Sequence, residues 1–200
     1  MEWLDDGSRE LDFTAAVLAD DAKNYHAWSH RQWAVRTFGL WDGELDFVDA
    51  LLDLDMRNNS AWSHRWFVVT RGDNFAPLPE HVVEREMAVA AEWARRVPRN
   101  ECAYNYLRGL AKKHARGLAA DAAVQLLALA GLGLAAPSGS PASPSSAAAP
   151  LLSFCADVLE AAGRAAEARD LCAQLARRDA VRAAYWSWRA ESVSEGPPPA

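Results

Sequence analysis

The 200-residue sequence lacks the features that mark secreted and membrane-spanning proteins. It has only three cysteines, Cys102, Cys155 and Cys172, and no C-x-x-C spacing. This usage argues against a disulfide framework or a cysteine metal site and indicates a reducing compartment. No segment approaches the roughly 20 consecutive apolar residues of a membrane helix, and the acidic start, Met1 to Asp6, does not resemble a secretory signal. The sequence predicts a cytoplasmic protein without membrane insertion.

The sequence also lacks an excess of basic residues. Its formal net charge is −6 at pH 7, and residues 1–60 hold 13 acidic against 5 basic side chains. Neutralisation of phosphates by Lys and Arg supplies most of the non-specific affinity for nucleic acids. We therefore expect no nucleic-acid partner, and anionic membranes are disfavoured for the same reason.

The motifs of common catalytic sites are missing as well. There is no Gly-rich phosphate loop, no H-E-x-x-H and no G-x-S-x-G. His26 and His30 have the i, i+4 spacing that can hold a metal on one helix. A second copy of this segment has Ser60 and His64 at the matching positions, so a metal site would exist in one copy only and would lack further ligands. We expect this chain to bind no metal or other cofactor by itself.

The sequence does contain an internal repeat with a period of 34 residues. The run KNYHAWSHRQW at 23–33 returns as RNNSAWSHRW at 57–66, and ELDF at 10–13 returns at 44–47. A period in the thirties is typical of helical hairpins that stack into an array. Apolar residues recur at helical spacing, and no segment alternates as a strand does. The prediction is an all-α solenoid of antiparallel helical hairpins.

The repeat divides the chain into regions. Hairpin repeats are expected over residues 1–132, with strong copies around 10–38 and 44–71 and a weaker copy at 80–115. Residues 133–150 are rich in Pro, Ser, Ala and Gly, a composition typical of a flexible linker. A helical pair and a degenerate last repeat are expected over 151–190, followed by a disordered tail over 191–200.

Helix caps recur with the period. Asn24, Asn58 and, in the weaker copy, Asn100 stand where the side-chain oxygen of an N-cap residue accepts a backbone N–H. Asp42 is placed to cap the helix that follows the first hairpin. Asn100 follows Asn58 by 42 positions instead of 34, which indicates an eight-residue insertion, most simply in the loop at 71–79.

Three residue types recur inside the second helix of both strong copies. They are Trp28 and Trp62, His30 and His64, and Arg31 and Arg65. We expect the tryptophans to wedge neighbouring helices together, because a buried indole covers about 150–250 Å². The arginines are expected to pair with acidic groups between helices, since a guanidinium fork matches a carboxylate. The histidines are expected to be hydrogen-bonding residues of the repeat.

Three positions at the start of this helix differ between the copies. The first copy has Lys23, Tyr25 and His26. The second copy has Arg57, Asn59 and Ser60. Residues that diverge inside a strict repeat are candidates for work that the repeat itself does not require. A cation, a phenol and an imidazole at a helix N-terminus suit an anion, with help from free N–H groups and the helix dipole. Ordinary surface variation accounts for the difference equally well.

These motifs resemble the α subunit shared by protein farnesyltransferase and protein geranylgeranyltransferase type I. The matching segments are DAKNYHAWSHRQW at 21–33, LWDGEL at 40–45, DMRNNSAW at 55–62, VERE at 83–86 and NYLRG at 105–109. The resemblance is specific over residues 2–115 and loose over 116–190. It implies a right-handed superhelical array of hairpins that wraps around a β subunit.

The resemblance implies the α subunit of a heterodimeric CaaX protein prenyltransferase, a transferase with little or no activity alone. In that family the β subunit carries the catalytic zinc and most of the isoprenoid and peptide sites, and the holoenzyme also implies magnesium. By motif position, Asn24, Tyr25 and His26, together with Lys23, would lie near the prenyl diphosphate. The implied partners are a β subunit, a prenyl diphosphate and a CaaX protein substrate. The choice between farnesyl and geranylgeranyl would belong to β.

The sequence departs from the family pattern at its start, where an earlier repeat with its own Lys-Asn-Tyr run is missing. This predicts a subunit truncated at the N-terminus, with an uncovered apolar face near Leu11 and Phe13. Two alternatives stay open. One is a non-catalytic, tetratricopeptide-like adaptor, for which a 34-residue period is equally suitable. The other is the α subunit of the Rab geranylgeranyltransferase, which has similar repeats.

Overall fold

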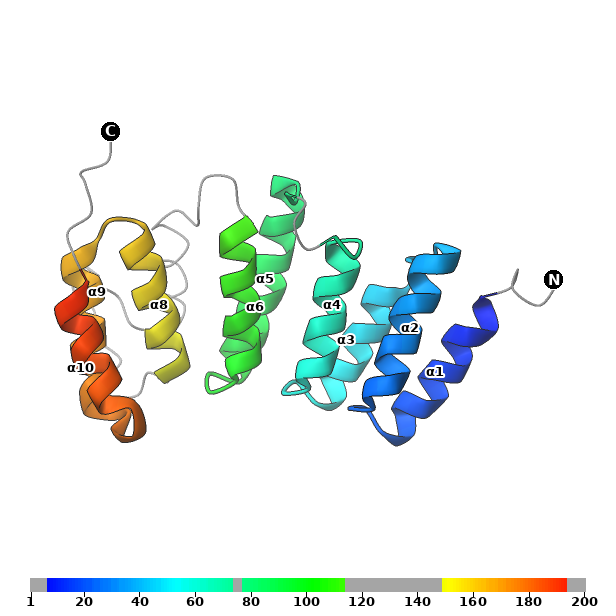
Figure 1. Cartoon of the computed structure of the whole chain (residues 1–200), viewed down its shortest axis with the longest axis horizontal. Helices are drawn as coiled ribbons and strands as arrows, with labels where there is room; N and C mark the ends of the chain where they lie inside the picture. The colour runs from blue at the N-terminus through cyan, green and yellow to red at the C-terminus, as the bar shows by residue number, and fades with distance from the viewer. Residues whose placement is uncertain (1–6, 74–76, 114–148, 194–200) are drawn as a thin grey trace. The chain divides into compact units, whose positions relative to one another are not determined.

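A computed structural model describes residues 7–73, 77–113 and 149–193 (Figure 1). Within these ranges the regular elements are α-helices and one short 3₁₀ turn, which confirms the predicted all-α class. The end of the predicted repeat region, 114–132, and all but the last two residues of the predicted linker lie outside the described residues. The chain divides into two compact units, Met1–Leu78 and Pro79–Ala200, which are described one at a time.

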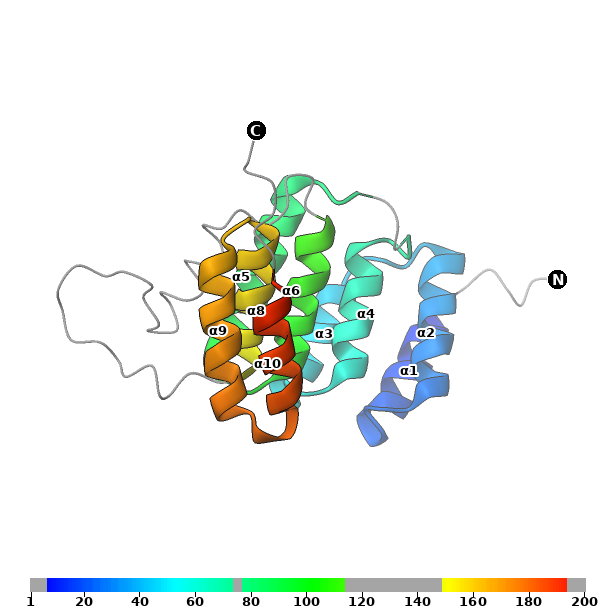
Figure 2. The same cartoon turned by 60° about the vertical axis from the view of Figure 1, so that its left-hand side comes forward.

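The first unit contains two helical hairpins. Its helices are α1 (Ser8–Asp20), α2 (Tyr25–Phe38), α3 (Glu44–Leu54) and α4 (Asn59–Val69). α1 packs against α2 and α3 against α4, and the second helices of the two hairpins, α2 and α4, contact each other. Both views show the two hairpins side by side (Figures 1 and 2). Each hairpin corresponds to one strong copy of the repeat.

The turns of the first unit follow the repeat. The Oδ1 atom of Asn24 accepts the N–H of Ala27 at 3.0 Å, and that of Asn58 accepts the N–H of Ser60 at 3.0 Å, so both are N-caps. The prediction that Asp42 caps the next helix is wrong. α3 begins after Gly43, which has a left-handed φ of 80°, and no side chain caps it. Because this turn needs a left-handed residue next to the helix, glycine occupies the cap position.

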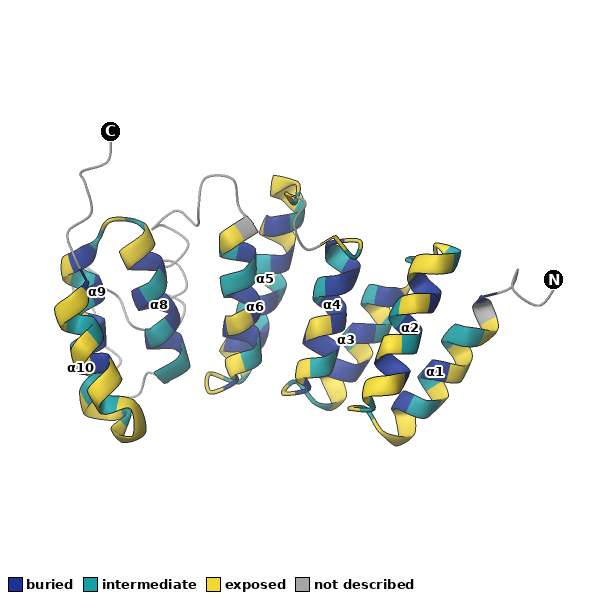
Figure 3. Ribbon diagram, in the orientation of Figure 1, coloured by how far each residue is buried: buried dark blue, intermediate teal, exposed yellow. Residues whose placement is uncertain are grey.

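The core of the first unit lies between its helices (Figure 3). Leu18, Ala34, Val35, Val48 and Leu52 are fully buried there. These residues come from α1, α2 and α3, so both hairpins contribute to the apolar interior. The buried tryptophans and the charged network described below lie among them.

The second unit contains five α-helices in its described part. They are α5 (Glu80–Arg96), α6 (Glu101–Lys113), α8 (Ala149–Ala161), α9 (Ala165–Arg178) and α10 (Ala183–Ser192), with the 3₁₀ turn η3 (Ala180–Arg182) before α10. α5 packs against α6, α8 against α6 and α9, and α9 against α10. α8 begins two residues earlier than the predicted helical pair, and α10 runs two residues into the predicted tail.

The third cap also falls in the second unit, and the insertion precedes it in the sequence. The Oδ1 atom of Asn100 accepts the N–H of Cys102 at 3.1 Å, at the start of α6. α5 has 17 residues, whereas its counterpart α3 has 11. The eight inserted residues are therefore shared between the loop after α4 and a longer α5. None of the helices described is long and apolar enough to cross a membrane.

Candidate functional site

A carboxylate and a side chain 20 positions later form a pair in each of the three copies. His30 Nε2 lies 2.6 Å from Glu10 Oε2, and His64 Nε2 lies 2.7 Å from Glu44 Oε2. In the third copy the hydroxyl of Tyr106 donates to Glu86 Oε2 at 2.8 Å. Sequence reasoning missed the glutamates as partners. The signal was present, because ELDF repeats with the same period as the histidines.

An arginine connects one hairpin to the next. Arg31 on α2 donates from Nε and Nη2 to the two carboxylate oxygens of Glu44 on α3, at 2.9 and 2.5 Å. Its Nη1 atom donates to the carbonyl of Leu11 at 2.9 Å, and its guanidinium lies 3.6 Å above the centre of the Phe47 ring. Both members of the ion pair are buried. In the second copy, Arg65 donates to Asp49 at 2.6 Å.

The shared glutamate in this network is an anion and the histidine is neutral. Burial alone would raise the pKa of Glu44, but the hydrogen bonds from His64 and Arg31 outweigh it and lower the pKa below its ordinary value. Burial lowers the pKa of His64, against the opposing influence of Glu44. The proton of neutral His64 therefore sits on Nε2, facing Glu44, and its buried Nδ1 has no hydrogen-bond partner among the described residues. This arrangement stabilises the hairpin interface and offers no group for catalysis.

The repeated tryptophans are buried and each donates to the turn that precedes its helix. The indole N–H of Trp28 donates to the carbonyl of Ala22 at 3.0 Å, and that of Trp62 to Met56 at 3.1 Å. In the last hairpin, Trp186 donates to a carboxylate oxygen of Asp179 at 3.0 Å. The rings fill the space between helices while their single polar atom is satisfied, which is a structural role.

The residues that differ between the copies lie together at the start of α2. The side chain of Tyr25 is 76% exposed, and its ring meets the exposed ring of His26 edge-on, with 5.6 Å between centroids. Lys23 precedes them on the surface, and its Nζ lies 3.2 Å from Asp55 Oδ2 in the matching turn of the second hairpin. Asn24 caps the helix between them. The structure thus brings Lys23, Asn24, Tyr25 and His26 into one exposed cluster.

An aspartate in the turn before each second helix of the first unit accepts a backbone N–H, and the one in the second hairpin also pairs with Lys23. Asp21 Oδ1 accepts the N–H of Lys23 at 3.0 Å, and Asp55 Oδ1 accepts the N–H of Arg57 at 2.9 Å. The N–H of Arg57, together with the ammonium of Lys23, lowers the pKa of Asp55. Asp55 is therefore an anion that holds Lys23 beside the start of α4. The turns before α2 and α4 thus lie next to each other on this surface.

The start of α2 carries hydrogen-bond donors of the kind that suit an anion. The first N–H groups of a helix have no acceptor within the helix. The Asn24 side chain takes the N–H of Ala27, which leaves those of Tyr25 and His26 at the surface. The helix dipole adds positive potential at the same point, and the ammonium of Lys23 there is paired with Asp55. Phosphate groups match this combination of donors.

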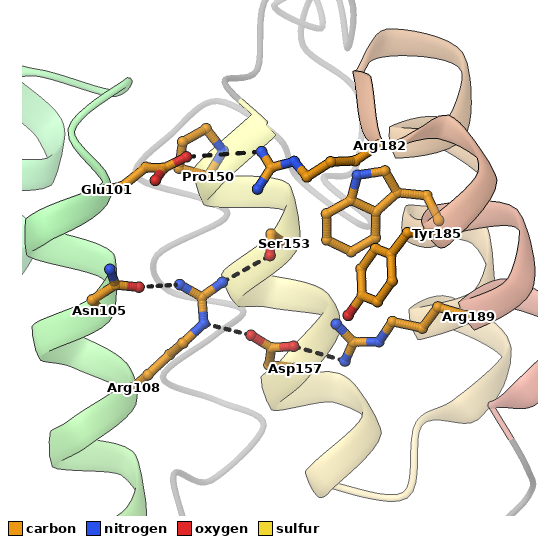
Figure 4. A pocket seen from close by; sticks show the side chains of 10 residues that line it. Glu101, Asn105, Arg108, Pro150, Ser153, Asp157, Arg182, Tyr185 and Arg189 are labelled. Carbon is orange, nitrogen blue, oxygen red and sulfur yellow. Dashed lines mark hydrogen bonds and ion pairs between the residues drawn. The ribbon is translucent and has the colours of Figure 1, made fainter. Parts of the chain in front are cut away.

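A second polar cluster surrounds a cavity of about 440 Å³ in the second unit (Figure 4). Figure 4 shows Asp157 on α8 between two guanidinium groups, that of Arg108 on α6 at 2.6 Å and that of Arg189 on α10 at 2.7 Å. Arg108 also donates to Ser153 at 2.8 Å, and Arg182 pairs with Asp179. The charges that line the cavity are thus already paired with one another. We assign them to the packing of α6, α8 and α10.

The described residues contain no group of three or more His, Cys, Asp or Glu side chains arranged to hold a metal ion. His30, which could have joined His26 as a ligand, is bound to Glu10. Among the described residues, His26 and His30 are therefore not joined by further side chains into a group that could hold a metal ion.

The fold and the repeated contacts define a class: helical-hairpin repeat proteins whose second helices start at an Asn cap and carry a buried Trp. The family model for the protein prenyltransferase alpha subunit repeat matches residues 8–38, 41–72 and 83–114. These are the three copies described above. The chain belongs to the protein prenyltransferase alpha subunit repeat family.

A solved structure is similar over nearly the whole chain. It is that of Candida albicans protein geranylgeranyltransferase-I complexed with GGPP, with 27% sequence identity and a TM-score of 0.75. The similarity covers 94% of this chain and 60% of that one, so the chain spans about 60% of the length of the solved relative. None of the curated protein sequences matches the chain significantly.

Proposed function

We propose that the chain is the α subunit of a heterodimeric CaaX protein prenyltransferase. It would scaffold a β subunit and present the cluster of Lys23, Asn24, Tyr25 and His26 to the prenyl diphosphate. The observation that carries the proposal is this anion-compatible cluster at the start of α2 on a prenyltransferase-type repeat, in which Tyr25 and His26 are exposed. The solved relative, a protein geranylgeranyltransferase-I in complex with GGPP, supports the same class of ligand.

In such a transfer, the cysteine thiolate of the protein substrate attacks the first carbon of the isoprenoid. A carbon–sulfur bond forms, the carbon–oxygen bond to the diphosphate breaks, and the diphosphate leaves with the bonding electrons. Negative charge therefore grows on the diphosphate oxygens in the transition state. Donors that are already oriented toward that charge lower the barrier. Here the ammonium of Lys23 and the hydroxyl of Tyr25 would donate to those oxygens, with the ring of His26 beside them.

The partner would supply what this chain lacks. The family resemblance assigns zinc, which activates the substrate thiol, to the β subunit. Magnesium would accompany the diphosphate. We place the heterodimer in the cytoplasm, in keeping with the three cysteines, none of which forms a disulfide. Whether the lipid is farnesyl or geranylgeranyl would be decided by the β subunit.

Co-expression with candidate β subunits tests the proposal. The chain is produced with the β subunit of protein farnesyltransferase, of geranylgeranyltransferase type I or of the Rab enzyme, and each complex is purified through a tag on β. The proposal expects co-purification with one of the first two and transfer of the matching lipid to a CaaX peptide. Binding to the Rab-type β subunit alone would support that enzyme instead. The absence of any complex at micromolar concentrations would contradict the proposal.

A further inference from the structure

The backbone next to Lys23 is fixed by two buried side chains. The carbonyl of Ala22, the preceding residue, accepts the indole N–H of Trp28 at 3.0 Å and the side-chain N–H of Asn58 at 2.9 Å. Both donors are almost fully buried, and Asn58 belongs to the second hairpin. The point from which the Lys23 side chain extends is therefore fixed against the second hairpin, where its ammonium reaches Asp55.

The ion pair between Lys23 and Asp55 is itself at the surface. Its Nζ–Oδ2 distance is 3.2 Å, and the two side chains are 64% and 45% exposed. An ion pair with this exposure is weak, because water and salt screen both charges. The other carboxylate oxygen of Asp55 accepts the N–H of Arg57 at 2.9 Å, so the carboxylate keeps a partner when the ammonium leaves. A more highly charged anion can therefore take Lys23 from Asp55 at little cost.

The turn that contains Asp55 occurs three times in the chain and does not require an aspartate. Asp21, Asp55 and Val97 stand at matching positions, and the carbonyl of each accepts the N–H three residues later, at 3.0, 2.9 and 2.9 Å. Their φ angles are also alike, at −130°, −140° and −135°. Because Val97 has no polar side chain, the backbone forms this turn without a carboxylate. The side chain at position 55 is thus free to serve another purpose.

Asp55 is charged at neutral pH and lies where an anionic ligand would need the same ammonium. Its pKa is lowered chiefly by the N–H of Arg57, with a smaller contribution from Lys23. An anion that binds the N–H groups at the start of α2 gains the charge of Lys23 only by displacing this carboxylate. The affinity of the start of α2 for an anion therefore depends on a residue of the second hairpin.

We propose that Asp55 is a positioning residue for Lys23 that competes with the diphosphate for its ammonium. In the free chain, Asp55 holds the ammonium between the turns before α2 and α4. A bound diphosphate takes the ammonium, and Asp55 retains the N–H of Arg57. When the leaving diphosphate dissociates, Asp55 takes the ammonium back, so it weakens binding and favours release. The inference rests on the proposed function, because it takes the prenyl diphosphate and the diphosphate released from it as the ligands of this site.

Binding of inorganic pyrophosphate to the full chain, measured by isothermal titration calorimetry, tests the inference. Asp55→Asn removes the competing charge and keeps an oxygen that can accept the N–H of Arg57. We expect this variant to bind pyrophosphate about 3- to 10-fold more tightly, the scale on which one surface charge acts on a highly charged neighbour. Asp55→Val, which gives the turn the residue found at position 97, should tighten binding as well. A merely structural defect would weaken binding.

Two controls separate competition for Lys23 from a change in net charge. Asp46→Asn makes the same charge change on an exposed residue at the opposite end of α3. It should alter the affinity by less than about twofold, because salt screens charges over roughly 8 Å. Lys23→Met should weaken binding, and adding Asp55→Asn to it should restore less than about twofold, since the two residues act through one contact.

The outcomes distinguish this inference from the proposed function. If the unmodified chain binds pyrophosphate and Asp55→Asn leaves the affinity unchanged or lowers it, the inference is wrong and the anion site stands. The same holds if Asp46→Asn gives an equal gain, or if the gain persists in full with Lys23→Met. If none of these proteins binds pyrophosphate at millimolar concentrations, the anion site of the proposed function is contradicted, and the inference is overturned with it.

Discussion

The two strong copies of the repeat contain the same contacts in different surroundings. The Glu44–His64 pair is buried and receives Arg31, whereas the Glu10–His30 pair is partly exposed and receives no arginine among the described residues. Their donor–acceptor distances differ by only 0.1 Å. The repeat sequence therefore sets the geometry of the pair, and we expect the neighbouring hairpin to set how much the pair contributes to stability.

The copies also differ in sequence at the start of their second helices. Positions that are identical in both copies, such as the tryptophans, pack or make hydrogen bonds inside the repeat. Tyr25 and His26, which differ from the second copy, are exposed and make no contact that the hairpin needs. Identity between copies therefore marks residues of the fold, and divergence marks candidates for function.

Removing the carboxylate from the buried pair should have the largest effect on stability. Glu44→Ala leaves the guanidinium of Arg31 buried without its counter-ion, and we expect a loss of about 3–5 kcal/mol in the free energy of unfolding. Glu10→Ala makes the same change in the exposed copy and should cost less than about 1 kcal/mol. Urea unfolding of both variants measures the difference. Equal losses would mean that the neighbouring hairpin does not determine how much the Glu–His pair contributes to stability.

Removing the two Asn caps should lower stability by different amounts, and this difference should be smaller than the one between Glu44→Ala and Glu10→Ala. Asn24→Ala removes one cap, which typically costs about 1 kcal/mol. Asn58→Ala removes a cap and also the hydrogen bond to Ala22 in the other hairpin, which adds about 1 kcal/mol. Denaturant midpoints measured under the same conditions compare the variants. If Asn24→Ala lowers the denaturant midpoint at least as much as Asn58→Ala, the hydrogen bond from Asn58 to Ala22 contributes less to stability than we expect.

Lowering the pH should reduce the stability of the folded chain through the buried Glu44–His64 pair. The pKa of His64 is lowered in the folded state, so below its ordinary value of 6.5 the unfolded chain binds a proton that the folded chain does not. The lowered pKa of Glu44 acts in the same direction below its ordinary 4.5. Stability should therefore fall as the pH drops from 7 toward 4. Unfolding at several pH values should show a shallower fall for His64→Gln between pH 7 and 5; an unchanged slope would exclude His64 as a cause.

Much of the repeat could be predicted from the sequence because its physical signals are local. An Asn before an apolar-periodic run identifies a cap, and Asn24 and Asn58 serve as caps. The prediction that Asp42 is a cap failed because the sequence does not show that this turn needs a left-handed residue next to the helix. Gly43 meets that requirement. The sequence thus predicted the Asn cap residues but did not predict the backbone conformation of the turn before α3.

Contacts between distant residues were harder to predict. The arginines were expected to pair with acidic groups, but the choice of Glu44 for Arg31 depends on how the hairpins stack. The three glutamates that pair 20 positions ahead were missed, although their period was visible. At the candidate site, the sequence singled out Lys23, Tyr25 and His26, but only the fold shows that Asp55 holds Lys23 next to the start of α4.

The smallest effect on stability is expected from exchanging the divergent residues between the copies. The variant K23R/Y25N/H26S gives the first helix start the residues of the second, which is known to fold as a capped helix. Its stability should stay within about 0.5 kcal/mol of the unmodified chain, because the changed side chains are exposed. This variant separates function from fold.

The measurement that tests the central claim most directly is prenyl transfer by the heterodimer that contains this exchange variant. We predict normal assembly with the β subunit and a rate of transfer to a CaaX peptide that is lower by about 10- to 100-fold, because donors to the leaving diphosphate are lost. R57K/N59Y/S60H, the reverse exchange in the second copy, is the matched control and should leave the rate within about twofold. An unchanged rate for K23R/Y25N/H26S, with intact assembly, would contradict the role assigned to the start of α2.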